Sequence, residues 1–327
     1  MTVLNQVSAT GITDDNLKAR LARVPTPMGG LALGIASLGA AWAIVLPEQG
    51  EGLKIAAATV AALLVMQVAL KFMLHPRLIR EDLGHPVISS VMPTCTMAIM
   101  VISQALLPYA GLAARTLWVA AVGTHILLLS GFIRNRARSF RLEDMVPSWF
   151  VPPVGIIVSA VTSTGMGFDP VVSWLFLFGL SSYFLKLPVM LYRLLFKGMI
   201  PEAALPTFAI LAAPASLSLA GYLTIANEPD LVLVSVLTPL AIFMTAIVYI
   251  AFVRLLRLPF SPGYAAFTFP MVIGATALLK LGSELETVTS GLFFRLGMLE
   301  LAVATLMVFY VAVRYVYFYL GPVISRK

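Results

Sequence analysis

The sequence predicts an all-α integral membrane protein with ten transmembrane helices, and three observations lead to this prediction. Of the 327 residues, 60 % are hydrophobic and 11 % are charged, whereas soluble domains carry about 25 % charged residues. The mean hydropathy is +0.95. Long runs without Asp, Glu, Lys or Arg recur along the chain. A soluble enzyme or a disordered chain is therefore excluded, and a single cysteine, Cys95, excludes a disulfide scaffold.

Ten stretches are apolar enough to cross a bilayer, which takes about 20 helical residues per crossing. They do not alternate between apolar and polar residues as barrel strands do. Each is therefore predicted to be a helix that satisfies its own backbone hydrogen bonds. In chain order they are residues 24–47, 55–70, 83–114, 116–133, 145–168, 170–185, 203–227, 231–253, 258–279 and 287–314.

Lys and Arg residues gather in alternate connections between these spans, and 18 of the 22 fall on the side of both termini. The positive-inside rule places that side in the cytoplasm, and we expect the inner (plasma) membrane of a bacterium. Residues 1–24 are expected to be a cytoplasmic tail rather than a signal peptide, residues 25–320 a single transmembrane domain, and residues 321–327 a second cytoplasmic tail. The net charge of +7 is interpreted as this topology signal, so no nucleic-acid partner is expected.

The chain also contains a five-fold repeat of helical hairpins. Each unit starts with a proline at the predicted cytoplasmic end of an odd-numbered span, and the starts are 61, 61, 59 and 56 residues apart. These prolines are Pro25, Pro86, Pro147, Pro206 and Pro262. Five equivalent hairpins predict a quasi-five-fold arrangement, with the odd-numbered helices around an axis and the even-numbered helices outside them.

A second proline lies inside four of the odd-numbered helices, at Pro93, Pro152, Pro214 and Pro270, whereas the first repeat has Ala32 there. A proline within a helix removes a backbone hydrogen bond and kinks the helix. In a membrane, neighbouring groups or water satisfy the freed carbonyl group. The matching positions therefore predict four equivalent kinks.

Small and hydroxyl-bearing residues are frequent in the odd-numbered spans, and Gly34, Thr94 and Ser216 are candidates to line a conduit. Two interpretations stay open for such residues. They allow helices in a membrane to pack closely, and they also leave room for a narrow conduit along the axis.

The sequence contains no P-loop, no metal-ligand spacing and no nucleophile motif, so neither an enzyme nor a metal or cofactor site is expected. The apolar runs of the odd-numbered helices hold no Asp or Glu for a proton relay. Arg295 and Glu300 interrupt the last span; an ion pair or interfacial anchoring is expected for them, with proton coupling as the alternative. Five helix N-termini at a basic surface give a weak preference for anions over cations.

Four stretches resemble a known family. They are residues 25–42 with Pro25-Thr26-Pro27, residues 85–94 with His85-Pro86-Val87, residues 147–152 and residues 267–271. Together with the ten spans and the repeats, they resemble the TehA family of tellurite-resistance and dicarboxylate transporters. Plant slow-type anion channels of guard cells and fungal malate permeases are similar. The resemblance covers about residues 20–320.

This resemblance implies a central pore within the five hairpins and a homotrimer with one pore per subunit. It implies passive conduction of small inorganic or organic anions, such as chloride, nitrate or a dicarboxylate, across the lipid bilayer. It also implies that a phenylalanine of the ninth helix plugs the pore, and the position in the motif corresponds to Phe269. A proton-coupled carrier of dicarboxylate or tellurite oxyanions is the first alternative, and a non-transporting receptor or scaffold is the second.

The residues themselves favour the same phenylalanine as a gate. Phe269 directly precedes Pro270, where a kink can turn a side chain toward the axis. The equivalent positions of the other repeats hold smaller or aliphatic side chains, namely Leu31, Met92, Val151 and Ala213. Phe267 lies about 200° further around a helix and is expected to be packed.

Overall fold

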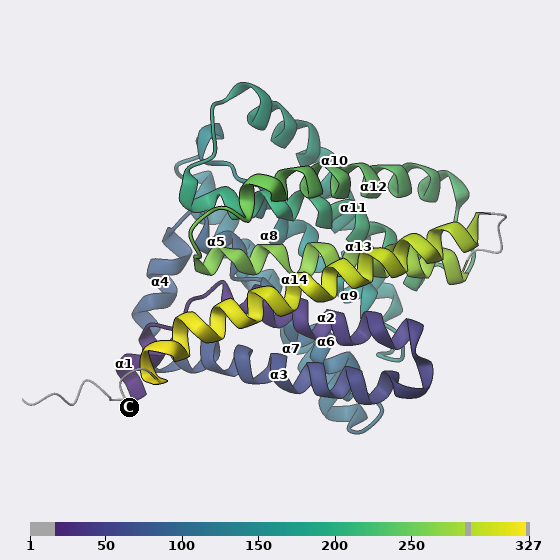
Figure 1. Cartoon of the computed structure of the whole chain (residues 1–327), viewed down its shortest axis with the longest axis horizontal. Coiled ribbons are helices and arrows are strands. Elements are labelled where there is room, and N and C mark those ends of the chain that lie inside the picture. The colour runs from purple at the N-terminus through teal and green to yellow at the C-terminus, as the bar shows by residue number, and fades with distance from the viewer. Residues whose placement is uncertain (1–16, 285–288, 325–327) are drawn as a thin grey trace, which may run out of the picture.

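The computed structural model describes residues 17–284 and 289–324 (Figure 1), and within them all regular structure is helical. The α-helices are α1 (Leu17–Ala22), α2 (Met28–Val45), α3 (Pro47–Leu74), α4 (Pro76–Gly84), α5 (Ile88–Val91), α6 (Thr94–Leu106), α7 (Gly111–Ala137), α8 (Val151–Val154), α9 (Val158–Val161), α10 (Asp169–Phe196), α11 (Ala213–Ile225), α12 (Leu231–Leu255), α13 (Phe269–Glu284) and α14 (Ser290–Ile324). Five 3₁₀ segments join them: η1 (Leu142–Asp144), η2 (Pro147–Phe150), η3 (Gly155–Ile157), η4 (Glu202–Ala212) and η5 (Pro262–Phe267).

Nine helical segments in the described residues are long and apolar enough to cross a membrane. They follow the predicted spans in order, which confirms an all-α membrane protein. The predicted span at 145–168 is the exception, because the structure has there a shorter apolar segment, Pro147–Val161, built from α and 3₁₀ pieces. Helix length therefore supports nine crossings, and the predicted count of ten depends on this short segment.

The helices form two layers that match the predicted odd and even spans. Four odd-numbered spans are long enough to cross a membrane, and in the most apolar stretch of each, 61–83 % of the residues are buried. The corresponding range in the even-numbered spans is 22–39 %. Every residue from Pro147 to Ala160 is buried as well. We call the five buried units the inner segments: α2, α5–α6, η2–α9, η4–α11 and η5–α13. The outer helices are α3, α7, α10, α12 and α14.

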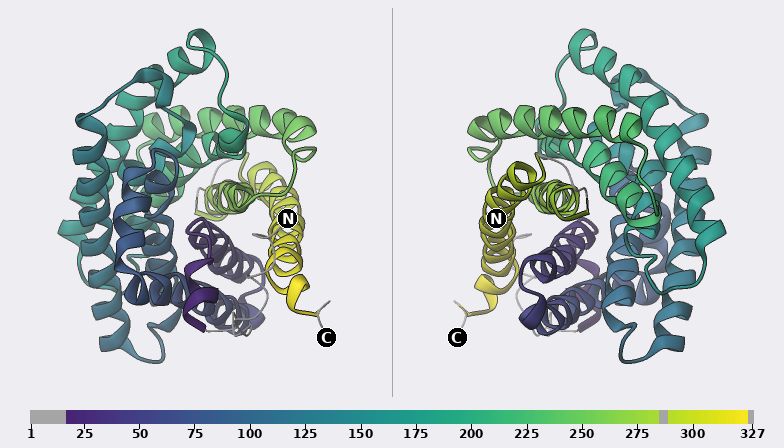
Figure 2. Two further views of the ribbon diagram at one scale, coloured as in Figure 1. Left: turned by 90° about the vertical axis from the view of Figure 1, so that its left-hand side faces the viewer. Right: turned by 90° about the vertical axis from the view of Figure 1, so that its right-hand side faces the viewer.

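The inner segments form a closed ring in chain order. Helix α2 packs on α6, α6 on α9, α9 on α11, α11 on α13, and α13 returns to α2. The first hairpin, purple in Figure 2, accordingly lies beside the last hairpin, which is coloured yellow-green to yellow. This ring is the quasi-five-fold arrangement that the repeats predict.

The four interior prolines lie where an inner segment changes its helical form. Pro93 separates α5 from α6, Pro214 is the second residue of α11 after η4, and Pro270 is the second residue of α13 after η5. Pro152 is the second residue of α8, which follows η2. The first turn of a helix tolerates proline because its N–H groups have no intrahelical partner. With Ala32 in place of proline, α2 runs unbroken.

Side chains from the outer helices complete the broken third inner segment. In a regular helix the Trp149 carbonyl would accept a hydrogen bond from the N–H of residue 152 or 153. Both positions hold proline, which has no N–H, and Lys186 Nζ donates to that carbonyl at 2.9 Å instead. His125 Nε2 donates to the Pro152 carbonyl at 2.9 Å, and its Nδ1 lies 2.9 Å from the Thr96 hydroxyl. Polar groups in the bilayer region thus replace the hydrogen bonds that proline removes.

Candidate functional site

A cavity of about 820 Å³, open space at its mouth included, lies inside the N-terminal halves of the inner segments. All five inner segments line it, and we call it the N-terminal cavity. Representative lining residues are Gly30, Thr94, Val151, Thr207 and Ala265. Among the described residues, no charged side chain lines this cavity. Its wall is therefore made of apolar side chains, a few hydroxyl groups and backbone.

A second cavity, about 940 Å³ with open space included, lies inside the C-terminal halves of the same segments. We call it the C-terminal cavity. Its wall is more polar, and one or more residues from each inner segment line it, including Ser37, Gln104, Thr162, Leu217 and Thr276. Lys54 and Lys280 also line it. By the positive-inside rule they are expected on the side opposite the termini, as are Arg115 and Arg295.

Phe269 and Leu217 are the only described residues that line both cavities. Phe269 begins α13, and only 7 % of its surface is exposed. The two cavities therefore follow one another along the ring axis and meet at these two side chains.

The backbone of the fifth inner segment is held tightly against α2 next to Phe269. The Thr268 hydroxyl lies 2.7 Å from the Ala265 carbonyl oxygen and 3.1 Å from that of Gly30. A Cβ atom on Gly34 would lie 2.5 Å from the Thr268 Cβ and 3.2 Å from the Phe269 nitrogen. Glycine at position 34 is thus required for this close approach, which fixes where the Phe269 side chain starts.

The other predicted site residues divide between cavity walls and helix contacts. Thr94, Pro214 and Pro270 line the N-terminal cavity. Gly34 and Ser216 lie in neither cavity wall; the Ser216 hydroxyl donates to the Ala212 carbonyl at 3.0 Å, while the next residue, Leu217, faces both cavities. Pro93 and Pro152 also lie outside both walls, at the helix junctions described above.

Phe267 is packed in the way expected of it. Its ring is fully buried and lies 5.3 Å from the Phe252 ring and 4.7 Å from the Tyr264 ring, measured between centroids. Two phenylalanines separated by one residue therefore have different surroundings, since one packs against aromatic side chains and the other faces two cavities.

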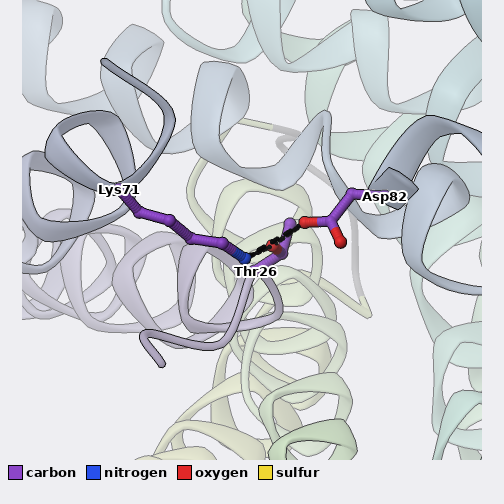
Figure 3. A network of polar contacts seen from close by, with 3 residues as sticks. All are labelled: Thr26, Lys71 and Asp82. Carbon is purple, nitrogen blue, oxygen red and sulfur yellow. Dashed lines mark hydrogen bonds and ion pairs between the residues drawn. The ribbon is translucent and has the colours of Figure 1, made fainter. Parts of the chain in front are cut away.

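A network of polar contacts anchors α2 next to the N-terminal cavity (Figure 3). Lys71 Nζ lies 2.8 Å from the Thr26 hydroxyl oxygen and 3.1 Å from Asp82 Oδ2, and the Thr26 hydroxyl donates to the same carboxylate oxygen. Only 6 % of Lys71 is exposed. The network joins the start of α2 to the end of α3 and to α4, next to Pro27 in the cavity wall.

Glu300 is buried in α14, with 7 % of its surface exposed, and its Oε1 has no hydrogen-bond partner among the described residues. A Cβ atom on Gly274 of α13 would lie 2.3 Å from that oxygen. Arg295 is exposed, and the described residues contain no ion pair between it and Glu300. The expected ion pair is therefore absent there, because residues five apart lie about 140° apart around a helix and Glu300 faces inward.

The fold and its two axial cavities are those of one class of protein, the helical membrane channels and transporters. The sequence model of the voltage-dependent anion channel family matches residues 23–316. The chain belongs to this family, which confirms the resemblance drawn from the sequence.

Two relatives from Methanocaldococcus jannaschii are each described as an uncharacterized transporter. One is 26 % identical over 229 residues, which cover 62 % of this chain and 66 % of the relative. The other is 24 % identical over 220 residues, which cover 58 % of this chain and 62 % of the relative. The matched part is thus slightly less than two thirds of either relative. This similarity is to transporters as a class and names no substrate.

Proposed function

We propose that this chain is a passive anion channel whose pathway runs through the two cavities and is closed by the ring of Phe269. The observation that carries the proposal is that Phe269 lines both cavities while being almost fully buried. A ring held at this junction blocks the pathway by its volume, so an anion passes only when the ring rotates or tilts. The closed state therefore dominates at rest.

Small anions fit the pathway better than cations or large organic solutes. The N-terminal cavity has no charged wall residue among the described ones, and its two wall hydroxyl groups, those of Thr94 and Thr207, already donate to carbonyls of their own segments. An anion there therefore meets mainly apolar side chains and backbone dipoles. Such a wall repays little of the cost of dehydration. Weakly hydrated anions such as nitrate or iodide should then pass at least as readily as chloride, and a dicarboxylate should pass less readily.

The proposed cellular setting follows from the charge distribution and the resemblance. The channel domain comprises residues 25–320, with residues 1–24 and 321–327 as cytoplasmic tails in the inner membrane of a bacterium. The working unit is a homotrimer with one pathway per subunit. No enzymatic step, cofactor or nucleic acid has a part in this proposal.

The proposal is tested by planar-bilayer recording of the purified, reconstituted protein with anion substitution. Phe269→Ala removes the ring without adding a polar group, and it is expected to raise the conductance many-fold while keeping the order of anion permeability. Reversal potentials should follow the anion gradient and ignore the cation. A Phe269→Ala protein that folds as the native oligomer yet conducts no more than the wild type would reject the gate.

One observation favours the proton-coupled carrier as the second candidate. A buried carboxylate without a partner is costly in a membrane and by default marks a functional group, and Glu300 is such a carboxylate on the helix that supports α13. Glu300→Gln keeps the size of the side chain and removes its titration. If anion uptake by the wild type is driven by a pH gradient and Glu300→Gln abolishes that drive at normal folded yield, the carrier replaces the channel. If pH gradients drive no uptake, Glu300 is structural.

A further inference from the structure

We infer that the C-terminal cavity contains an anion-binding site centred on Lys54 and Lys280, which captures a small monovalent inorganic anion before it reaches Phe269. The inference rests on the proposed function for the route past Phe269, but the binding site itself is defined by the geometry of the cavity. It makes the two ends of the pathway chemically different.

The charge in the pathway is confined to one end. Within the described residues, Lys54 and Lys280 are the only charged side chains that line either cavity. They come from different hairpins, Lys54 from α3 and Lys280 from α13, and the ring brings these hairpins together because α13 packs on α2. A cleft lined by charges of one sign with low-dielectric walls focuses the field and raises the local concentration of counter-ions.

Hydrogen-bond donors accompany the two ammonium groups. Ser37, Thr164 and Gln104 line the same cavity, and in the described part of the chain no hydrogen bond engages any of these three side chains. Thr276 and Thr162 differ, because their hydroxyl groups already donate to carbonyls of their own helices at 2.9 and 2.8 Å. The wall thus offers two hydroxyl groups and one amide donor beside two positive charges, a combination that suits a small anion.

The ion pair of Lys54 leaves room for an anion. Lys54 Nζ lies 2.7 Å from Glu51 Oε1, and the Glu51 side chain is 53 % exposed. Only 15 % of the Lys54 side chain is exposed, but a partner that is half in water is screened by solvent, so the pair holds Lys54 weakly. An ammonium group carries three donors, so a lysine that has one partner can still bind a second.

The alternative is that both lysines only extend along the wall to reach the interfacial water, as long basic side chains do near helix ends. In that case neutralising them changes neither anion binding nor low-salt conduction beyond a general surface-charge effect. Arg295 provides the matched control for this effect, because it is exposed on α14, lies by the predicted topology on the same side, and lines neither cavity.

The test combines a binding measurement with a conduction measurement. Chloride-35 NMR line broadening of the detergent-solubilised protein reports chloride binding whether or not the protein conducts. In the wild type, added nitrate should compete with chloride and remove part of this broadening. The double variant Lys54→Gln/Lys280→Gln is expected to lack that part, whereas Arg295→Gln is expected to keep it. Equal broadening in these two variants, each folded as the native oligomer, would overturn the inference.

Conduction is measured in the Phe269→Ala background at low and high chloride. The lysine variant should lower the current several-fold at low salt and little at 1 M, where the Debye length is about 3 Å. Arg295→Gln in the same background should change the current little at either concentration. If Phe269→Ala does not conduct, the proposed function fails while the NMR result still decides the binding site. If Phe269→Ala conducts, and the lysine variant and Arg295→Gln have equal currents at low salt, the binding site is rejected and the channel function is kept.

Discussion

The two cavities are built from the same five inner segments, yet their walls differ in helical form and in charge. Four of the five segments around the N-terminal cavity are built from short α or 3₁₀ pieces with prolines at their junctions, and no described residue of its wall is charged. The C-terminal cavity is surrounded largely by regular α-helix and contains two lysines. The prolines therefore mark where the wall changes from broken to regular helix, and Phe269 lies at that boundary in the fifth segment.

The largest effect on stability should come from the phenylalanine that is not in the pathway. Phe267→Ala removes a fully buried ring from an aromatic cluster and should lower the free energy of unfolding by about 3–5 kcal/mol. Because Phe269 faces cavities, Phe269→Ala should cost less stability and change conductance instead. Denaturant unfolding and bilayer currents on both variants separate the two roles. Equal stability losses would show that the two rings are packed alike.

The anchor beside the N-terminal cavity should also contribute strongly. Asp82→Ala leaves Lys71 buried without its carboxylate, and breaking such a pair costs about 3 kcal/mol or more. The exposed pair of Lys197 and Glu143, with 4.0 Å between the charged atoms, is the control. Glu143→Gln should change the midpoint of thermal unfolding little, because exposed pairs contribute about 0–1 kcal/mol. Similar shifts for both variants would remove the special role of the anchor.

The close approach behind Phe269 predicts a smaller effect. Gly34→Ala places a methyl group against Thr268, and overpacking of this kind costs about 1–3 kcal/mol. The displaced segment should also alter the resting current, because Phe269 follows directly. Gly52→Ala is the control, since nothing lies within 4 Å of a Cβ atom there. A Gly34→Ala protein with native stability and native current would contradict the proposed support of the gate.

Much of this architecture follows from residue patterns that are periodic along the chain. Charge-free stretches locate the spans, and the recurring prolines give the five-fold ring. The prolines alone do not show that each lies at the start of a new helical piece, because that depends on where the preceding α or 3₁₀ segment ends. The short third segment was predicted at full length for the same reason.

The residues that line the two cavities were harder to predict from the sequence. A glycine or serine in an inner helix serves close packing or faces a cavity depending on its angle around the helix, and the breaks at the prolines shift that angle between segments. Ser216 and Leu217 are adjacent, and only Leu217 lines the cavities. Lys54 and Lys280 are separated by most of the chain, so only the folded ring brings them to one cavity. Phe269 was singled out by its large ring, its neighbouring proline and the family resemblance; it lines both cavities, and its role as a gate stays a prediction.

The smallest expected effect concerns the order of anions. With an uncharged wall in the N-terminal cavity, the ratio of nitrate to chloride permeability should be one or more, because nitrate loses its hydration shell more easily. The lysine variants should leave this ratio nearly unchanged, since charge alone discriminates poorly between two monovalent anions. Reversal potentials under bi-ionic conditions measure it. Chloride far ahead of nitrate would indicate a specific chloride ligand in the wall.

Thiol accessibility tests most directly whether the Phe269 ring separates the two cavities. In a Cys95→Ala background, Ala40→Cys places a thiol in the C-terminal cavity and Ala266→Cys places one in the N-terminal cavity. A sulfonated methanethiosulfonate reagent is applied to one face at a time, in right-side-out and inside-out vesicles. With Phe269 present, each thiol should react from its own side only, and with Phe269→Ala both should react from either side. Reaction of both thiols from a single side while Phe269 is intact would contradict the account.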